Sequence, residues 1–146
     1  MAINKIYAET QENNRPRDLS LVTTPSGLTT IQPGTPVILG SRPAVSITAS
    51  GNGTKTDTNI GGNILSVTYG NGGASLADNQ ATFAFDGTFE FAVDGATATT
   101  TDEVAVFITS DGELTLTESG NTRYGITDYP TDYRREAGIA PVKIGA

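Results

Sequence analysis

The fold class of this chain is decided by the stretch Thr82-Phe83-Ala84-Phe85-Asp86-Gly87-Thr88-Phe89-Glu90-Phe91-Ala92-Val93. Side chains alternate between the two faces of a β-strand, so residues of equal parity share a face. The large apolar residues of this stretch all have odd numbers: Phe83, Phe85, Phe89, Phe91 and Val93. We therefore predict that this face forms the centre of a hydrophobic core.

The Asp86-Gly87 dipeptide inside this stretch allows two interpretations. Asp-Gly is a favoured two-residue hairpin turn, whereas a Gly bulge would let a single strand continue. The odd parity is kept across the dipeptide, which favours a continuous, bulged strand over Ala81–Val93. The even-numbered residues Glu90 and Asp94 then lie on the opposite face, which we expect to be solvated.

From Leu19 onward the chain has the pattern of an all-β domain. Short runs rich in Thr, Val, Ile and Phe are interrupted every few residues by Gly, Pro, Asn or Asp, as in β-sandwiches and small barrels. Ser110-Asp111-Gly112 predicts a hairpin turn, and residues 130–137 leave room for one short helix. The other expected strands are Leu19–Thr24, Thr35–Leu39, Ala44–Ala49, Ile64–Tyr69, Glu103–Thr109, Glu113–Thr117, Thr122–Thr127 and Ala140–Ile144.

Composition narrows the classes of function. The chain has 146 residues and a net charge of -7, which argues against binding nucleic acid through phosphate contacts and against adsorption to membranes through basic residues. It contains no Cys, His or Trp, which excludes disulfides, thiolate or imidazole metal sites, and His- or Cys-based catalysis. The longest apolar runs, such as Pro36–Leu39, are far shorter than the ~20 residues of a membrane span. We expect no metal, no cofactor, no catalytic residue, and neither nucleic acid nor membrane as a partner.

Residues 1–18 differ from the rest and are predicted to form an extended N-terminal arm. They contain no Gly, and a helix over Ile3–Glu12, although conceivable, would be marginal in water on its own. Fully extended, the segment would reach roughly 60 Å, so it is either a disordered terminus or an arm that becomes ordered on a partner. The residues predicted to make that contact are Ile3, Asn4, Lys5, Ile6, Tyr7, Arg15 and Arg17.

Catalytic and nucleotide-binding motifs are approached but not completed. Gly51-Asn52-Gly53-Thr54-Lys55-Thr56 lacks the Gly directly before Lys that a P-loop requires. Gly73-Ala74-Ser75-Leu76-Ala77 ends in Ala where a nucleophile elbow has Gly, and the chain has no His to activate the serine. Paired carboxylates remain the only acid-base option, with Glu90 as the best candidate.

Tyrosine and arginine residues concentrate in and beside a polar loop near the C-terminus. Both residue types are enriched in protein interfaces. One interpretation is therefore a contact with a second subunit or a partner, and the other is a loop whose Tyr rings only cover the end of the domain. The residues concerned are Arg123, Tyr124, Tyr129, Tyr133, Arg134 and Arg135.

A series of short motifs resembles the small phage capsid decoration proteins of the beta-tulip type. Gly34–Val45 resembles their opening, a Gly-x-Pro-Val strand followed by a Gly-Ser turn, and Gly87-Thr88-Phe89-Glu90 resembles the end of their central strand. Thr101 stands where the family has Gly, and residues 51–73 look like an insertion. The further matches follow in order along the chain at Asp102–Val106, Asp111–Thr115, Gly120–Ile126 and Ala140–Ile144.

This resemblance implies a fold and a function. The fold would be a single small β-barrel domain, β-tulip-like, over residues 19–146, with a Gly/Asn/Thr-rich loop region at 51–73 and an extended arm at 1–18. The function would be structural: a virion protein, often a homotrimer, binds the outer surface of an expanded phage head and cements neighbouring major capsid protein subunits. We expect synthesis in the host cytoplasm and attachment to the capsid through the arm.

Two other classes of function stay open. The runner-up is a carbohydrate-binding module of a tail fibre or adhesin, which would use the loop from Tyr124 to Tyr133. The third is a carboxylate-based hydrolase centred on Glu90. A decoration protein would bind protein shells and ignore sugars, whereas a carbohydrate-binding module would do the reverse.

Overall fold

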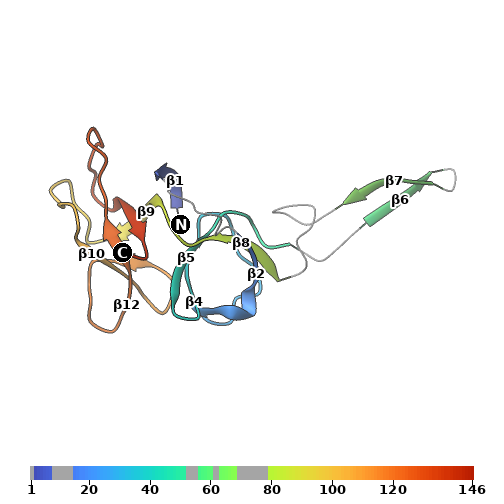
Figure 1. The fold of residues 1–146 in the computed structure, drawn as a ribbon, viewed down its shortest axis with the longest axis horizontal. Helices are drawn as coiled ribbons and strands as arrows, with labels where there is room; N and C mark the ends of the chain where they lie inside the picture. Colours follow the sequence, from blue (N-terminus) through green and yellow to red (C-terminus); the bar gives the residue numbers. More distant parts are fainter. Residues whose placement is uncertain (1, 8–14, 52–55, 61–62, 69–78) are drawn as a thin grey trace.

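The computed structural model describes residues 2–7, 15–51, 56–60, 63–68 and 79–146, which are almost entirely β-structure. Figure 1 shows a closed β-barrel at one end, a second sheet beside it and a two-stranded hairpin at the other end. The predicted all-β fold with a small barrel is therefore confirmed.

The barrel is formed by β9 (Thr88–Asp94), β11 (Leu114–Thr115), β10 (Ala105–Ile108), β12 (Thr122–Thr127) and β13 (Ile139–Ile144). Each strand pairs with the next in this order, and β13 pairs back onto β9 to close the barrel. Only the β11–β9 pair is parallel. β1 (Ala2–Tyr7) extends this sheet by pairing antiparallel with β9.

The second sheet has the order β2 (Arg15–Asp18), β8 (Gln80–Ala84), β5 (Arg42–Ser46), β4 (Pro36–Leu39) and β3 (Val22–Thr24). Its central strands are buried on both faces, which accounts for the continuous apolar run of β4. Ile38 and Val45 pack into the barrel core. Their neighbours Val37 and Ala44 belong to a second core, beneath the 3-10 helix η1 (Leu19–Leu21). This sheet is thus a wall shared by two cores.

The hairpin of β6 (Thr56–Ile60) and β7 (Asn63–Thr68) lies far from the barrel in Figure 1. It falls within the region that was predicted to be mainly loop, at residues 51–73. The strand predicted at Ile64–Tyr69 corresponds to β7, and β6 is its unpredicted partner. The near-motifs around Lys55 and Ser75 lie outside the described residues.

The Phe-rich stretch is divided between two strands in two sheets, so the prediction of one continuous strand is wrong. β8 ends at Ala84 and β9 begins at Thr88, and these two strands do not pair, which excludes a hairpin as well. Gly87 lies in the connection with a φ of 101°, a conformation that residues with a Cβ rarely adopt. The five odd-numbered apolar residues are buried as predicted, but Phe83 and Phe85 lie in the second core and the others in the barrel core.

Most other predicted strands are found near their expected positions. The hairpin predicted at Asp111-Gly112 joins β10 to β11. β4 and β5 are joined by Gly40-Ser41, where Gly40 has the positive φ, 65°, that type II′ turns require at their first position. Residues 19–21 form a 3-10 helix instead of the start of a strand, and residues 130–137 contain no helix.

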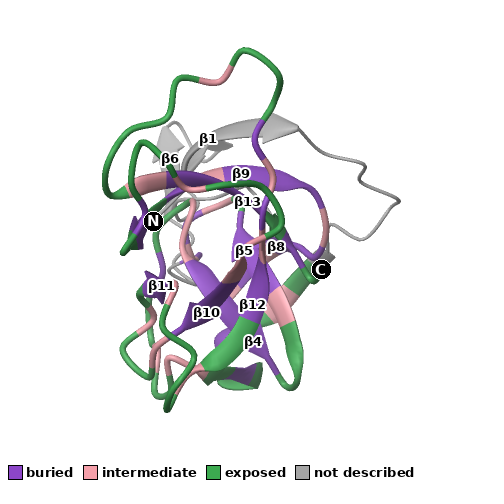
Figure 2. Ribbon diagram, turned by 90° about the vertical axis from the view of Figure 1, so that its left-hand side faces the viewer, coloured by how far each residue is buried: buried purple, intermediate pink, exposed green. Residues whose placement is uncertain are grey.

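Burial follows the two cores, as Figure 2 shows: the strands are largely buried and the long connections are exposed. No helix within the described ranges has the length and apolar character that crossing a membrane requires. The same ranges contain no group of three or more side chains suited to hold a metal ion.

Candidate functional site

The tyrosine-arginine loop connects β12 to β13 over residues 128–138. Tyr129 is buried, packs into the barrel core and contacts the ring of Tyr133, with the ring centroids 5.5 Å apart. The backbone N–H of Tyr129 donates to Oδ1 of Asp102 over 2.5 Å. The backbone N–H of Tyr133 donates to the carbonyl of Pro130 over 3.0 Å. Both rings therefore cover the barrel core, which agrees with the second of the two interpretations of this loop.

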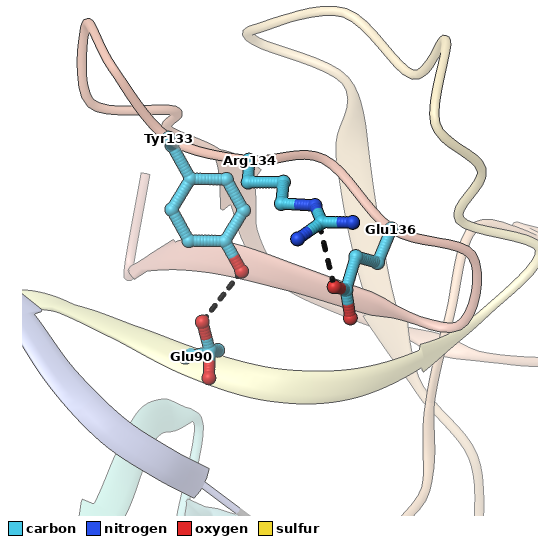
Figure 3. A network of polar contacts seen from close by, with 4 residues as sticks. All are labelled: Glu90, Tyr133, Arg134 and Glu136. Carbon is cyan, nitrogen blue, oxygen red and sulfur yellow. Dashed lines mark hydrogen bonds and ion pairs between the residues drawn. The ribbon is translucent and has the colours of Figure 1, made fainter.

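The hydroxyl of Tyr133 points at Glu90 on β9, as Figure 3 shows, and donates to its Oε2 over 2.5 Å. Burial, then this hydrogen bond and the charge of Glu90, raise the pKa of Tyr133 above its ordinary value of 10.0. Tyr133 is therefore a neutral donor that holds the Glu90 carboxylate in place. Glu90 and Asp94 lie on the more exposed face of β9, as predicted.

The two loop arginines lie on the outside. The guanidinium of Arg135 is 4.2 Å from the ring centroid of Tyr129, and its Nε donates to the carbonyl of Thr100 over 3.0 Å. Nε of Arg134 is 3.9 Å from Oε1 of Glu136, with the two side chains 91% and 56% exposed. An ion pair this exposed contributes little to stability, so Arg134 is available to an acidic partner.

Tyr124 is a core residue, which corrects its assignment to a subunit or partner contact. It is fully buried, its ring stands edge-on to Phe91, and its hydroxyl donates to the carbonyl of Ala44. Its neighbour Arg123 points outward and is exposed, with Nε donating to the carbonyl of Gly125 over 3.1 Å. Of the six residues predicted at this site, the three arginines are thus the ones that remain open to a partner.

Residues 1–18 contribute two strands that pair with the chain itself, instead of the predicted free arm. In β1, Lys5 lies opposite Phe89, and in β2, Arg17 lies opposite Ala81. The extended conformation agrees with the prediction, and the helix considered for Ile3–Glu12 is absent over residues 2–7. The side chains of the other predicted contact residues, Ile3, Asn4, Lys5, Ile6, Tyr7 and Arg15, lie outside the described part of the structure.

β1 lies at an edge of its sheet. Among the described strands it has a neighbour on its β9 side only. An unpaired strand edge presents backbone N–H and C=O groups to which a further strand can bind. The N-terminal segment therefore offers a site for β-strand addition even though it is not a free arm.

A small pocket on the second sheet was not predicted. Its volume is about 300 Å³, and we call it the basic pocket because two arginines line it. The odd parity of Phe85 predicted that the residue is buried, but not that its ring faces guanidinium groups. Nothing in the sequence around Arg42, which follows a Gly-Ser turn, indicated a binding role. The lining residues are Arg17, Leu21, Leu39, Gly40, Arg42 and Phe85.

Comparisons of the chain with protein-family models, with curated proteins and with solved structures find no match. The strand edge of β1 and the outward-facing arginines beside the barrel, together with the basic pocket on the second sheet, are features by which one protein binds another.

Proposed function

We propose that the protein decorates a phage head: it binds the outer surface of the expanded capsid and cements neighbouring major capsid protein subunits. The observation that carries this proposal is the ordered series of motifs between Gly34 and Ile144 that resembles decoration proteins. Each motif overlaps a strand or hairpin of the fold, at β4–β5, β9, β10, β11, β12 and β13, but the Gly87–Glu90 motif lies at the start of β9 and not at the end of a strand.

Attachment is proposed to use β1. A capsid strand that pairs with the open edge of β1 would gain main-chain hydrogen bonds without requiring catalytic or metal-binding residues. The residues predicted to contact the capsid, Ile3 to Tyr7, belong to this strand. The barrel behind β1 is closed, so it is a rigid support for the attached strand.

We also propose that the protein acts as a homotrimer on the virion surface. Three copies would present three β1 edges to neighbouring capsid subunits. Once one edge is bound, the others bind at a high effective concentration, so modest individual contacts give firm attachment. Neither a cofactor nor a catalytic residue is part of this proposal.

The carbohydrate-binding alternative has less support. It relied on a loop of exposed Tyr rings, because a ring must expose a face to stack on a sugar. Tyr124 and Tyr129 are buried, and the hydroxyl of Tyr133 is hydrogen-bonded to Glu90.

The test is co-sedimentation of the purified protein with expanded capsids stripped of decoration, quantified per capsid subunit. We expect saturation at a fixed stoichiometry. A variant lacking residues 1–7 loses β1 but keeps all five strands that close the barrel, and we expect it to bind more weakly. Glu118→Gln, which changes the charge of an exposed residue that has no proposed role, is the control and should bind like the wild type. Circular dichroism checks that each variant is folded.

The absence of binding to matched capsids at micromolar protein would contradict the proposal. Binding to a panel of glycans in the same preparation would then favour the carbohydrate-binding alternative. Equal binding of the variant without β1 would leave capsid decoration standing and remove the proposed role of the strand edge.

A further inference from the structure

The basic pocket places two arginines beside apolar residues on a chain whose net charge is -7. We propose that it binds a carboxylate-bearing peptide segment, an Asp or Glu side chain flanked by apolar residues, on the protein partner. This inference deepens the proposed function and rests on it only for the partner's identity, in which case the segment belongs to the capsid surface.

Both arginines of the pocket are gathered around one ring. Cζ of Arg42 is 4.4 Å and Cζ of Arg17 is 5.4 Å from the centroid of Phe85. Phe85 is only 7% exposed and belongs to the second core, so its ring is a fixed platform. A guanidinium that contacts a ring through its face keeps the N–H donors in its plane available to an acceptor. The pocket therefore presents donors whose positions are set before a ligand arrives.

The positive charges of these arginines are not compensated within the described part of the chain. No acidic side chain there forms an ion pair with either of them, since the ion pair found is that of Arg134 with Glu136. Nη1 of Arg17 donates to the carbonyl of Pro16 over 3.1 Å, and the side chain of Arg42 forms no hydrogen bond within the described part of the chain. A carboxylate is the ligand that guanidinium groups bind best in proteins, through two parallel hydrogen bonds.

The remaining walls of the pocket are apolar. Leu21 is a large hydrophobic residue that is 52% exposed, and Leu39 lies beside it in the lining. The backbone is fixed at this point, because the N–H of Gly40 donates to the carbonyl of Leu21 over 3.1 Å and Oγ1 of Thr23 donates to the carbonyl of Gly40 over 2.9 Å. An apolar residue next to the bound carboxylate would cover Leu21.

Size and charge favour a single carboxylate-bearing side chain over an extended polyanion. A volume of about 300 Å³ is at the lower end for ligand pockets, which suits one side chain with part of its flanking residues. An extended polyanion such as nucleic acid would meet the repulsion of a chain with net charge -7. A single inserted carboxylate meets the two arginines instead.

The first experiment titrates the full-length protein with a probe peptide while the arginine Nε–H signals are followed by NMR. The probe is acetyl-Gly-Leu-Glu-Leu-Gly-amide, and its counterpart carries Gln in place of Glu. We expect saturable shifts at Arg42 and Arg17 with a dissociation constant on the order of 1 mM, since a short flexible peptide loses much of its freedom on binding. Binding should weaken with added salt, and the Gln peptide should bind at least about tenfold more weakly.

Matched variants test the assignment to the pocket. Arg42→Gln should weaken binding of the Glu peptide at least about tenfold. Arg42→Lys keeps the charge but loses the planar fork, and should bind with intermediate affinity. Lys143→Gln removes an exposed basic side chain on β13, away from the pocket, and should leave binding unchanged. Thermal unfolding of each variant confirms that it is folded.

Three results would overturn the inference. The first is that the Gln peptide binds with the same affinity as the Glu peptide. The second is that inorganic phosphate shifts the same signals with the same affinity, which would make the pocket a general anion site. The third is that the arginine signals shift with protein concentration in the absence of peptide, which would assign the pocket to a second copy of this chain.

Co-sedimentation with capsids separates this inference from the proposed function. If the wild type binds capsids and the double variant Arg17→Gln/Arg42→Gln binds at least about tenfold more weakly, the pocket contacts the capsid. If both bind equally, decoration stands and the pocket is not part of the contact. If the wild type does not bind, decoration fails, and the peptide titration alone decides whether the pocket takes a carboxylate.

Discussion

The hydroxyl of Tyr124 on β12 donates to the carbonyl of Ala44 on β5 over 2.7 Å, across 80 residues of sequence. Tyr124 is 0% exposed, and its ring meets Phe91 edge-on, with centroids 5.8 Å apart. Burial raises the pKa of Tyr124 well above its ordinary value of 10.0, so the hydroxyl stays protonated and remains a donor. This bond ties the barrel to the second sheet.

Tyr124→Phe is therefore expected to destabilise the protein. The substitution keeps the ring but leaves the Ala44 carbonyl without its side-chain donor, at a cost of about 1–3 kcal/mol for a buried group. Urea unfolding followed by circular dichroism measures this loss as a lower midpoint at an unchanged slope. Ser119→Ala, which removes an exposed hydroxyl, is the control and should stay within about 0.5 kcal/mol. An unchanged midpoint for Tyr124→Phe would contradict the role given to the bond.

Features of the fold with strong local signals were predictable from the sequence. The hairpin from Ile108 to Leu114 combines apolar strand residues with turn residues, and this pattern needs no knowledge of distant contacts. The division of the Phe-rich stretch was not predictable. Parity is the same whether a chain continues in one sheet or crosses into another, so it predicts burial but not the core in which a residue lies.

The candidate site was predictable only in part, because residue type does not reveal depth. Tyr124 was assigned to an interface by its type, but its burial depends on Ala44 and Phe91, which are distant in sequence. The contact of Arg42 with Phe85 likewise joins two strands. Neither contact leaves a periodic or spacing signal in the sequence.

Gly125→Ala is expected to weaken the closure of the barrel. Gly125 lies opposite Ile144 in the β12–β13 pair, and a Cβ at this position would lie 2.2 Å from the carbonyl oxygen of Lys143. Backbone must move to relieve such a contact, so we expect a loss of about 3 kcal/mol, measured by calorimetric unfolding.

The matched control for this substitution is Gly120→Ala. Gly120 has a φ of 75° and nothing within 4 Å of an added Cβ. Its substitution therefore introduces backbone strain without crowding, and this strain should cost about 1 kcal/mol of stability. Equal losses for the two variants would show that crowding against Lys143 is not the cause.

Asp102→Ala is expected to loosen the tyrosine-arginine loop. Oδ1 of Asp102 accepts a hydrogen bond from the backbone N–H of Tyr129, a residue that is itself buried. Without this acceptor the free energy of unfolding should fall by about 1–2 kcal/mol, and hydrogen exchange at the Tyr129 amide should accelerate. Asp102→Asn keeps an acceptor oxygen and should have a smaller effect. An unchanged exchange rate in Asp102→Ala would contradict this account.

Because the Tyr133 hydroxyl is partly buried and hydrogen-bonded to Glu90, the stability of the fold should change with pH in the alkaline range. The pKa of Tyr133 is raised, chiefly by burial and further by Glu90, so the folded state holds the phenolic proton more tightly than the unfolded state. The resulting stabilisation is complete below the unfolded-state pKa, about 10. It is lost as the pH rises from that value through the folded-state pKa.

We therefore expect the difference in unfolding free energy between the wild type and Tyr133→Phe to be largest below pH of about 9 and to shrink above about 10. Comparing the two proteins cancels the titration of the lysines and of the other tyrosines, which both proteins share. Glu90→Gln keeps an acceptor but removes the charge, so the phenol should ionise at lower pH than in the wild type, measured by absorbance of the phenolate. A difference between wild type and Tyr133→Phe that stays constant with pH would show that Tyr133 keeps an ordinary pKa and that its bond to Glu90 does not form in solution.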